Sequence, residues 1–283
     1  MNPNSFWMAR ERALPLSKPL IMGILNVTPD SFSDGGAHFS HEEAVLHADS
    51  LLSDGADIID IGGESTRPGF APVSAEDELH RIVPAVEAIR RRFPDCWISI
   101  DTVKPSVAEA ALKIGADIIN DVSGAEDPAM LEIVQRYNAG YVVTHGWQEH
   151  LRLEARLPSS LCGRSVGDWT LAGLRELLSK TLAAEIPPKN IMIDPGFGFG
   201  KKGAQNAELL ATLPNIVAAF AQPILIGVSR KHFLKDMYPQ ADGDNDKASA
   251  ICAREALAYG GRIFRVHNAK LTANALGISL PQT

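Results

Sequence analysis

Short apolar runs alternate with longer stretches of helical periodicity along the whole chain. Each run is nearly continuous in Ile, Val and Leu, which is typical of parallel strands buried on both faces. The predicted strands are 19–26, 57–63, 97–101, 117–120, 140–145, 190–194, 223–229 and 262–267. The predicted helices are 41–53, 75–92, 105–114, 128–137, 166–184, 207–212, 247–259 and 269–276.

Residues at the segment boundaries agree with this division. Ser74 precedes the second helix and Asp77 follows three residues later, a variant of the capping box. Pro105 and Pro128 suit the first turn of a helix. Glycines mark four helix-to-strand returns, where a left-handed C-cap is needed: Gly55, Gly115, Gly140 and Gly260.

Eight strand–helix units in series predict an α/β fold, a single (β/α)8 TIM barrel, in preference to an open doubly wound sheet. Residues 1–18 are assigned to an N-terminal extension and residues 19–283 to the barrel domain. Long loops follow strands 1, 2 and 5, at 27–40, 64–74 and 146–165. Because they follow strands, these loops are expected at the C-terminal face, where barrel active sites lie.

The composition of the chain limits the classes of molecule that it is expected to bind and the compartment where it is expected to lie. The 283 residues include 34 Asp plus Glu and 27 Lys plus Arg, a formal charge of −7, which argues against nucleic acid or an anionic membrane as partner. The most apolar stretch, 216–228, is interrupted and shorter than the roughly 20 residues of a membrane helix. With no signal peptide pattern, and with Cys96, Cys162 and Cys252 in no metal or disulfide spacing, the expected location is the cytoplasm.

Every predicted strand runs into a polar residue at its C-terminal end. Any one of them could be a helix N-cap, and His145 is equally consistent with a structural or a functional role. Eight together favour a site, because strand ends meet at one mouth of a barrel. These residues are Asn26, Glu64 to Arg67, Asp101, Asn120, His145, Asp194, Ser229 to Lys231 and Arg265 to His267.

The strand-end residues fall into two chemical halves. Asp101, Asn120 and Asp194 can accept hydrogen bonds from a heterocycle with a guanidine-like edge. The other half carries donors and positive charge, which suits a phosphate or diphosphate with a divalent cation. Its members are Asn26, Thr66, Arg67, Lys231, Arg265 and His267. Since Asn26 is the one carbonyl-type ligand, Mg²⁺ is expected to keep waters and to use substrate oxygens.

Several familiar catalytic motifs are absent from the sequence. Segment 196–202, GFGFGKK, has neither the first Gly nor the final Ser or Thr of a Walker loop. His41 and His47 are six residues apart, which does not match the HExxH zinc motif. Segment 227–231 lacks the second Gly of a nucleophile elbow. The motifs of the sequence therefore do not indicate a side chain that forms a covalent intermediate with a substrate.

Seven segments closely resemble the motifs of the dihydropteroate synthase family. They are MGILNVTPDSFSDGG (22–36), IDIGGESTRPG (60–69), SIDT (99–102), IINDVSG (118–124), DPGFGFGK (194–201), GVSRK (227–231) and FRVH (264–267). The resemblance implies a TIM-barrel transferase of folate biosynthesis. Such an enzyme joins 6-hydroxymethyl-7,8-dihydropterin diphosphate to p-aminobenzoate, uses Mg²⁺ and is a homodimer.

The resemblance also implies roles for individual residues. The catalytic residues would be Asp101, Lys231, Arg265 and His267. The pterin would be held by Asp101, Asn120, Asp194 and Lys231. The diphosphate would be held by Asn26, Arg67, Arg265 and His267, with Asn26 also at the metal. The p-aminobenzoate pocket would be framed by Phe32, Thr66, Arg67, Pro68 and Phe199.

The chain departs from the family pattern at three places. The fifth strand ends in Thr144, His145 and Gly146 where the family has His-Met, Asn268 stands where the family has Asp, and His232 stands where some members have Ser. These differences leave open a catalytically weak paralogue that retains a pterin site. A pterin-dependent methyltransferase domain with a corrinoid partner is the other alternative, although it has no need of Asn26 or of the FRVH segment.

Overall fold

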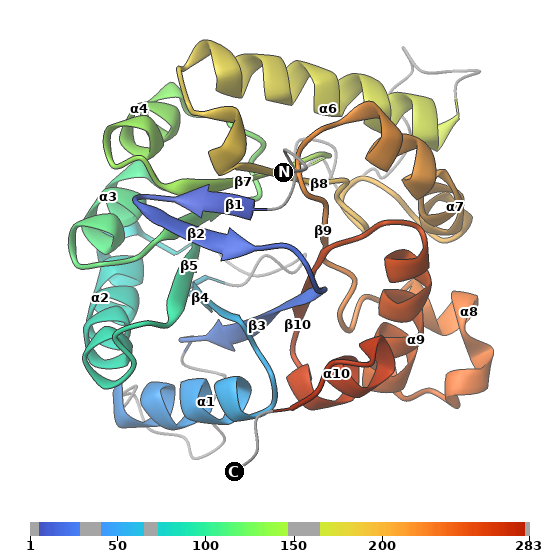
Figure 1. Ribbon diagram of the computed structural model, residues 1–283, viewed down its shortest axis with the longest axis horizontal. Helices are drawn as coiled ribbons and strands as arrows, with labels where there is room; N and C mark the ends of the chain where they lie inside the picture. The colour runs from blue at the N-terminus through green and yellow to red at the C-terminus, as the bar shows by residue number, and fades with distance from the viewer. Residues whose placement is uncertain (1–5, 29–40, 65–72, 147–164, 281–283) are drawn as a thin grey trace.

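The structure is a computed structural model, and it describes residues 6–28, 41–64, 73–146 and 165–280. Its central sheet has eight parallel strands in the order β8-β7-β6-β5-β4-β3-β10-β9, and a bridge between Ile193 and Ile224 joins the two ends. The strands form a nearly closed ring with helices between them (Figure 1), which confirms the predicted TIM barrel. They are β3 (Leu20–Asn26), β4 (Ile58–Gly62), β5 (Trp97–Asp101), β6 (Ile118–Asp121), β7 (Gly140–Thr144), β8 (Ile191–Asp194), β9 (Leu225–Ile226) and β10 (Ile263–Val266).

Successive residues of each strand are buried on opposite sides of the barrel wall. Leu20 and Met22 belong to a cluster of buried side chains inside the ring, whereas Ile21 belongs to the larger cluster between the strands and the helices. Both faces of a strand are therefore apolar. This is why the strands are nearly continuous runs of Ile, Val and Leu in the sequence.

Most helix boundaries follow the sequence signals closely, but the short helix 234–237 was not predicted and one predicted helix is too short. The helices are α1 (His41–Ser53), α2 (Ala75–Arg92), α3 (Pro105–Lys113), α4 (Pro128–Arg136), α6 (Val166–Ala183), α7 (Ala204–Ala219), α8 (Leu234–Met237), α9 (Asn245–Ala258) and α10 (Ala269–Leu276). The predicted helix 207–212 is too short, because α7 continues through Pro214. Leu213 and Ile216 are fully buried on that helix, and two such side chains stabilise by about 3–6 kcal/mol, which offsets the roughly 3 kcal/mol cost of an interior proline.

A short antiparallel hairpin covers the N-terminal end of the barrel. It consists of β1 (Phe6–Ala9) and β2 (Arg12–Pro15), inside the predicted extension 1–18, and it lies across the ring of strands in Figure 1. Trp7 is fully buried among the inward-facing strand residues, and its Nε1–H donates to the Asn190 carbonyl at 2.8 Å. The hairpin thus completes the inner core at the end opposite the strand-end residues.

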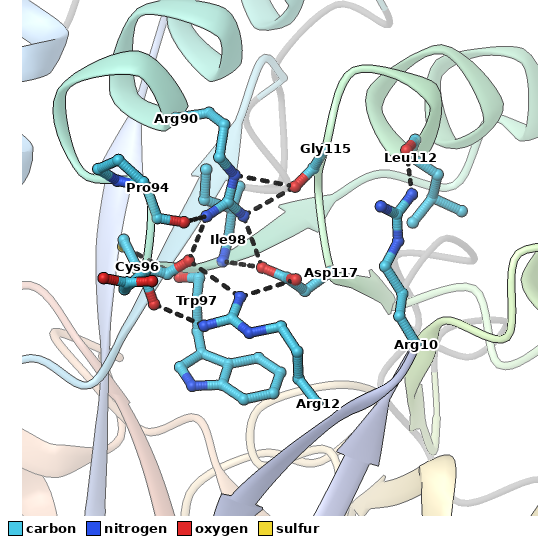
Figure 2. A network of polar contacts seen from close by, with 11 residues as sticks. Arg10, Arg12, Arg90, Pro94, Cys96, Trp97, Ile98, Leu112, Gly115 and Asp117 are labelled. Carbon is cyan, nitrogen blue, oxygen red and sulfur yellow. Dashed lines mark hydrogen bonds and ion pairs between the residues drawn. The ribbon is translucent and has the colours of Figure 1, made fainter.

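Asp117 fastens this hairpin to the barrel (Figure 2). Its Oδ1 accepts from Arg12 at 2.9 Å, and its Oδ2 accepts from Arg90 at 2.7 Å and from the Ile98 N–H at 3.0 Å. The Asp117 side chain is 4% exposed, and the two guanidinium groups also donate to backbone carbonyls around it. One carboxylate therefore links β2, α2 and the start of β5.

None of the helices in the described ranges is long and apolar enough to cross a membrane.

Replacing Asp117 by Ala should lower the free energy of unfolding by about 2–3 kcal/mol, because it leaves two partly buried guanidinium groups without their shared carboxylate. Urea unfolding followed by circular dichroism measures the change. Glu109→Ala is the matched control, because its pair with Arg136 is exposed (58% and 43%), and it should cost less than about 1 kcal/mol. Equal losses in the two variants would contradict the role given to Asp117.

Candidate active site

The described strand-end residues gather at the C-terminal mouth of the barrel, as the sequence predicts. Asn26, Asp101 and Asp194 end β3, β5 and β8, and Asn120 lies on β6. Lys231 follows β9, Arg265 lies on β10 and His267 follows it. Four residues predicted for the site lie outside the described residues, namely Phe32, Thr66, Arg67 and Pro68.

A partly buried guanidinium lies at the centre of this mouth. Arg265 donates through Nε to Asp60 Oδ2 at 2.6 Å and through Nη2 to Asp101 Oδ2. Asn120 Nδ2 donates to the same Asp60 oxygen at 3.2 Å. Burial lowers the pKa of Arg265, but Asp60 and Asp101 raise it by more, so the group stays charged. Arg265, which the sequence places in the donor half, therefore contacts the acceptor half directly.

Sequence reasoning missed Asp60. The residue lies in the middle of β4, is fully buried, and contacts Arg265 and Asn120, while its Oδ1 has no hydrogen-bond partner among the described residues. A search restricted to strand ends does not find Asp60, because the residue lies in the middle of its strand. The usable signal is that the second Asp of the run DIIDIGG has Ile on both sides, because an ionised group inside a barrel needs a cation beside it.

The two carboxyl groups at the mouth differ in their surroundings. Burial raises the pKa of Asp101 to about 7, while the Arg265 charge opposes this rise and the Asp60 charge adds to it. Burial also raises the pKa of Asp194, against the attraction of Lys231 and the hydrogen bond from the Gly196 N–H at 2.8 Å. Both carboxyls are desolvated acceptors, which suits a ligand that brings its own N–H donors.

Lys231 reaches the mouth because the preceding residue points away from it. Arg230 adopts a positive φ of 58° and pairs with Asp246 at 2.6 and 2.9 Å. The Lys231 ammonium donates to the Phe197 carbonyl and lies 4.4 Å from the centre of the Phe199 ring. Burial lowers the pKa of Lys231 to about 8, against the attraction of Asp194.

Ser229 orients His267. The Ser229 hydroxyl accepts from the His267 backbone N–H at 3.1 Å and lies 3.0 Å from its Nδ1. The neighbouring Asn268 instead caps α10, since its Oδ1 accepts from the Leu271 N–H at 3.0 Å. In this chain, where Asn268 stands in place of the family's Asp, Ser229 contacts the His267 ring.

The turn 195–203 after β8 is fixed to the start of α7. Asn206 is fully buried, accepts from the Gly198 N–H at 2.7 Å and donates to the Lys201 carbonyl at 3.0 Å. Gly198 has a φ of +78°, and a Cβ there would lie 3.0 Å from Lys231 Cδ. A glycine is needed at this point because the lysine stem lies directly against the backbone.

The residues around Gly62 fit a hard cation that keeps most of its water. A Cβ added at Gly62 would lie 3.7 Å from Asn26 Oδ1 and 3.8 Å from Asp101 Oδ2, so two oxygens border this space. Within the described ranges, no three His, Cys, Asp or Glu side chains are grouped as a metal site. This donor set fits Mg²⁺ held by Asn26 together with water and ligand oxygens.

Comparisons with known proteins agree with this geometry. A family model described as a pterin binding enzyme matches residues 22–267. The dihydropteroate synthase of Escherichia coli (strain K12) is 40% identical over 270 residues, which cover 95% of this chain and 94% of that protein. The chain belongs to the dihydropteroate synthase family.

Solved structures of the family have the same fold. The Xanthomonas albilineans dihydropteroate synthase with 4-aminobenzoic acid has a TM-score of 0.87 and 36% identity, with 96% of both chains covered. The same enzyme in complex with 7,8-dihydropteroate has a TM-score of 0.84 and 35% identity, again with 96% of both chains covered. The predicted family, fold and transferase class are thereby confirmed.

Asp60→Asn should lower kcat/KM of the family's reaction by about 10- to 100-fold, equivalent to about 1.4–2.7 kcal/mol, because Arg265 loses the charge that holds its Nε. Steady-state kinetics measures this effect. Asp57→Asn is the matched control, because Asp57 directly precedes the same strand and pairs with the exposed Lys18 at 2.8 Å, and it should change kcat/KM by less than about threefold. Equal effects would refute the importance of the Asp60–Arg265 pair.

Proposed function

We propose that this chain condenses 6-hydroxymethyl-7,8-dihydropterin diphosphate with p-aminobenzoate, giving 7,8-dihydropteroate and diphosphate. The observation that carries the proposal is the partly buried Arg265, held by Asp60 and Asp101 beside Lys231 in a chain of this family. Related enzymes have been solved with 4-aminobenzoic acid and with 7,8-dihydropteroate. The substrates proposed here are the precursors of that product.

The acceptor half of the mouth is the proposed pterin site. Asp101, Asn120 and Asp194 offer oxygens from β5, β6 and β8, and Asn120 also has an amide held by Asp60. The amino and ring N–H groups of a pterin match these acceptors. Lys231 supplies a donor on the same side, and its ammonium lies close to the Phe199 ring.

The donor half is the proposed diphosphate site. Arg265 and His267 lie on and after β10, and Asn26 ends β3, the strand that pairs with β10. Arg67 remains a proposed member outside the described residues. Mg²⁺ is proposed at Asn26, where it would neutralise diphosphate charge.

The reaction breaks the bond between the pterin methylene carbon and the diphosphate oxygen. The electron pair leaves with diphosphate, and the positive charge of Arg265 stabilises it. The methylene carbon gains cationic character beside the Asp101 carboxylate, and the neutral arylamine nitrogen attacks it. The arylamine then loses one proton to water or to the released diphosphate, which balances the reaction without an oxidant or a covalent enzyme intermediate.

The p-aminobenzoate pocket is proposed beside Lys231. Phe199 supplies an aromatic wall there, since its ring faces the Lys231 ammonium at 4.4 Å. Phe32, Thr66, Arg67 and Pro68 complete the proposed pocket on the grounds of family resemblance. A closed pocket would keep out water, which competes with the arylamine for the methylene carbon.

A homodimer in the cytoplasm is also proposed. The dimer rests on the resemblance to the family. The location rests on the cysteine pattern, and in the described residues Cys96 and Cys252 are buried free thiols, consistent with a reducing compartment.

Mixing the folded protein with dihydropterin diphosphate, p-aminobenzoate and Mg²⁺ should release one diphosphate per 7,8-dihydropteroate formed. A coupled diphosphate assay and chromatography of the pteroate measure the two products. Chelation of the metal should abolish release, and excess Mg²⁺ should restore it. Pterin binding without p-aminobenzoate-dependent release would contradict the proposal and indicate a catalytically weak paralogue.

The reaction should have an alkaline limb near pH 8, because Lys231 is cationic below its pKa of about 8 and loses that charge above it. The pH dependence of kcat/KM for dihydropterin diphosphate measures this limb. Lys231→Arg keeps the charge at higher pH, so the limb should move up by more than about one pH unit even if activity falls. An unmoved limb would assign the titration to another group.

A further inference from the structure

Lys201 is a buried cation that the proposed reaction does not use. The residue is 3% exposed, and its ammonium donates to the Gly196 carbonyl at 3.0 Å and to the Phe199 carbonyl at 3.1 Å. The ammonium also lies 3.2 Å from His145 Nδ1 and 4.9 Å from the centre of the Trp169 ring. It therefore connects the turn after β8 with the end of β7 and with α6.

The contact with His145 fixes the protonation of that ring. A lysine ammonium has only donors, so Nδ1 must accept and the neutral ring carries its proton on Nε2. Burial, with the added charge of Lys201, lowers the pKa of His145 well below its usual value. Trp169 packs edge-on against the ring at 4.5 Å, and a Cβ at Gly173 would lie 2.3 Å from Nε2. His145 is thus enclosed and acts as an acceptor for Lys201.

The backbone around this pair is packed too closely for side chains. A Cβ at Gly146 would lie 2.6 Å from the Phe199 carbonyl oxygen and 3.0 Å from Lys201 Nζ. A Cβ at Gly196 would lie 1.8 Å from the His145 carbonyl oxygen. The end of β7 and the turn after β8 therefore lie directly against each other, and the Lys201 ammonium lies where they meet.

The atoms that Lys201 holds belong to the residues that surround Lys231. Its acceptor Phe199 O is the carbonyl of the residue whose ring faces the Lys231 ammonium. Between its two acceptors, the Phe197 carbonyl accepts from Lys231, and Gly198 lies against the lysine stem. A shift of this turn would move the Phe199 ring and the Phe197 carbonyl together, whereas Asp101 and Asn120 are fixed by other strands.

We propose that Lys201 is a positioning residue for p-aminobenzoate, acting from beneath the turn 196–199 through the carbonyls of Gly196 and Phe199, with His145 as its third acceptor. This inference rests on the proposed function, because the pocket at Phe199 is part of it. The role also accounts for His145 at the fifth strand end, which supports the site without contacting substrate.

Lys201→Met should raise KM for p-aminobenzoate by about tenfold, equivalent to about 1.4 kcal/mol, and change KM for dihydropterin diphosphate by less than about threefold. The pterin should be affected less, because two of its four proposed partners, Asp101 and Asn120, lie on β5 and β6 and do not depend on the turn. Lys202→Met is the matched control, since that neighbouring lysine is exposed, and it should leave both KM values within about twofold of wild type. Steady-state kinetics with each substrate varied in turn measures the difference.

A pair of substitutions at His145 separates positioning from general destabilisation. His145→Asn places an amide oxygen where Nδ1 accepts, so KM for p-aminobenzoate should stay within about threefold of wild type. His145→Leu removes the acceptor, so KM for p-aminobenzoate should rise by about tenfold, as in Lys201→Met. Thermal unfolding checks that the compared variants are folded. Equal KM values in the two His145 variants, or an unchanged KM in Lys201→Met, would overturn this inference alone. Absence of turnover in the wild type would overturn the proposed function as well.

Discussion

The site depends on one set of ion pairs, made by the partly buried Arg265 guanidinium between the buried carboxylates of Asp60 and Asp101. Removing one partner of a buried ion pair typically costs about 3–5 kcal/mol, since the other charge is then left without water or counter-ion. Strands β4, β5 and β10 must therefore hold their register for the three groups to meet. The barrel supplies this register, because each strand is buried on both faces and cannot slip without exposing its apolar set.

The same interaction organises the chemistry around it. Asp60 is shared between Arg265 and Asn120, so one carboxylate orients a cation on the diphosphate side and an amide on the pterin side. Lys231 is oriented by a separate arrangement, in which the turn after β8 is packed against the end of β7. Strand pairing thus fixes Asp101, Asn120 and Arg265, while a packed turn fixes Lys231 and the Phe199 ring.

Patterns in the sequence predict the parts of this arrangement that repeat along the chain. The strand order, most helix bounds and the convergence of Asp101, Asp194 and Arg265 follow from runs of Ile and Val that end in polar residues. Asp60 and Lys201 were not found, since Asp60 acts through Arg265 and Asn120 and Lys201 acts in part through His145, all distant in sequence, and a pattern of neighbours contains no information about such pairs. The hairpin 6–15 was missed because its strands are only four residues long and are ordered by burial of Trp7 inside the barrel.

The ring of strands has one weakly bonded seam, where β8 and β9 meet through the bridge between Ile193 and Ile224. Asp194 ends the strand on one side of the seam, and Lys231 follows the strand on the other. With few ladder hydrogen bonds across it, the seam has the least resistance to local opening among the described strand pairs. Local opening of the barrel at this seam would therefore change the distance between the Asp194 carboxylate and the Lys231 ammonium first. A ligand that contacts both groups would thus hold the two sides of the seam together and stabilise the closed ring.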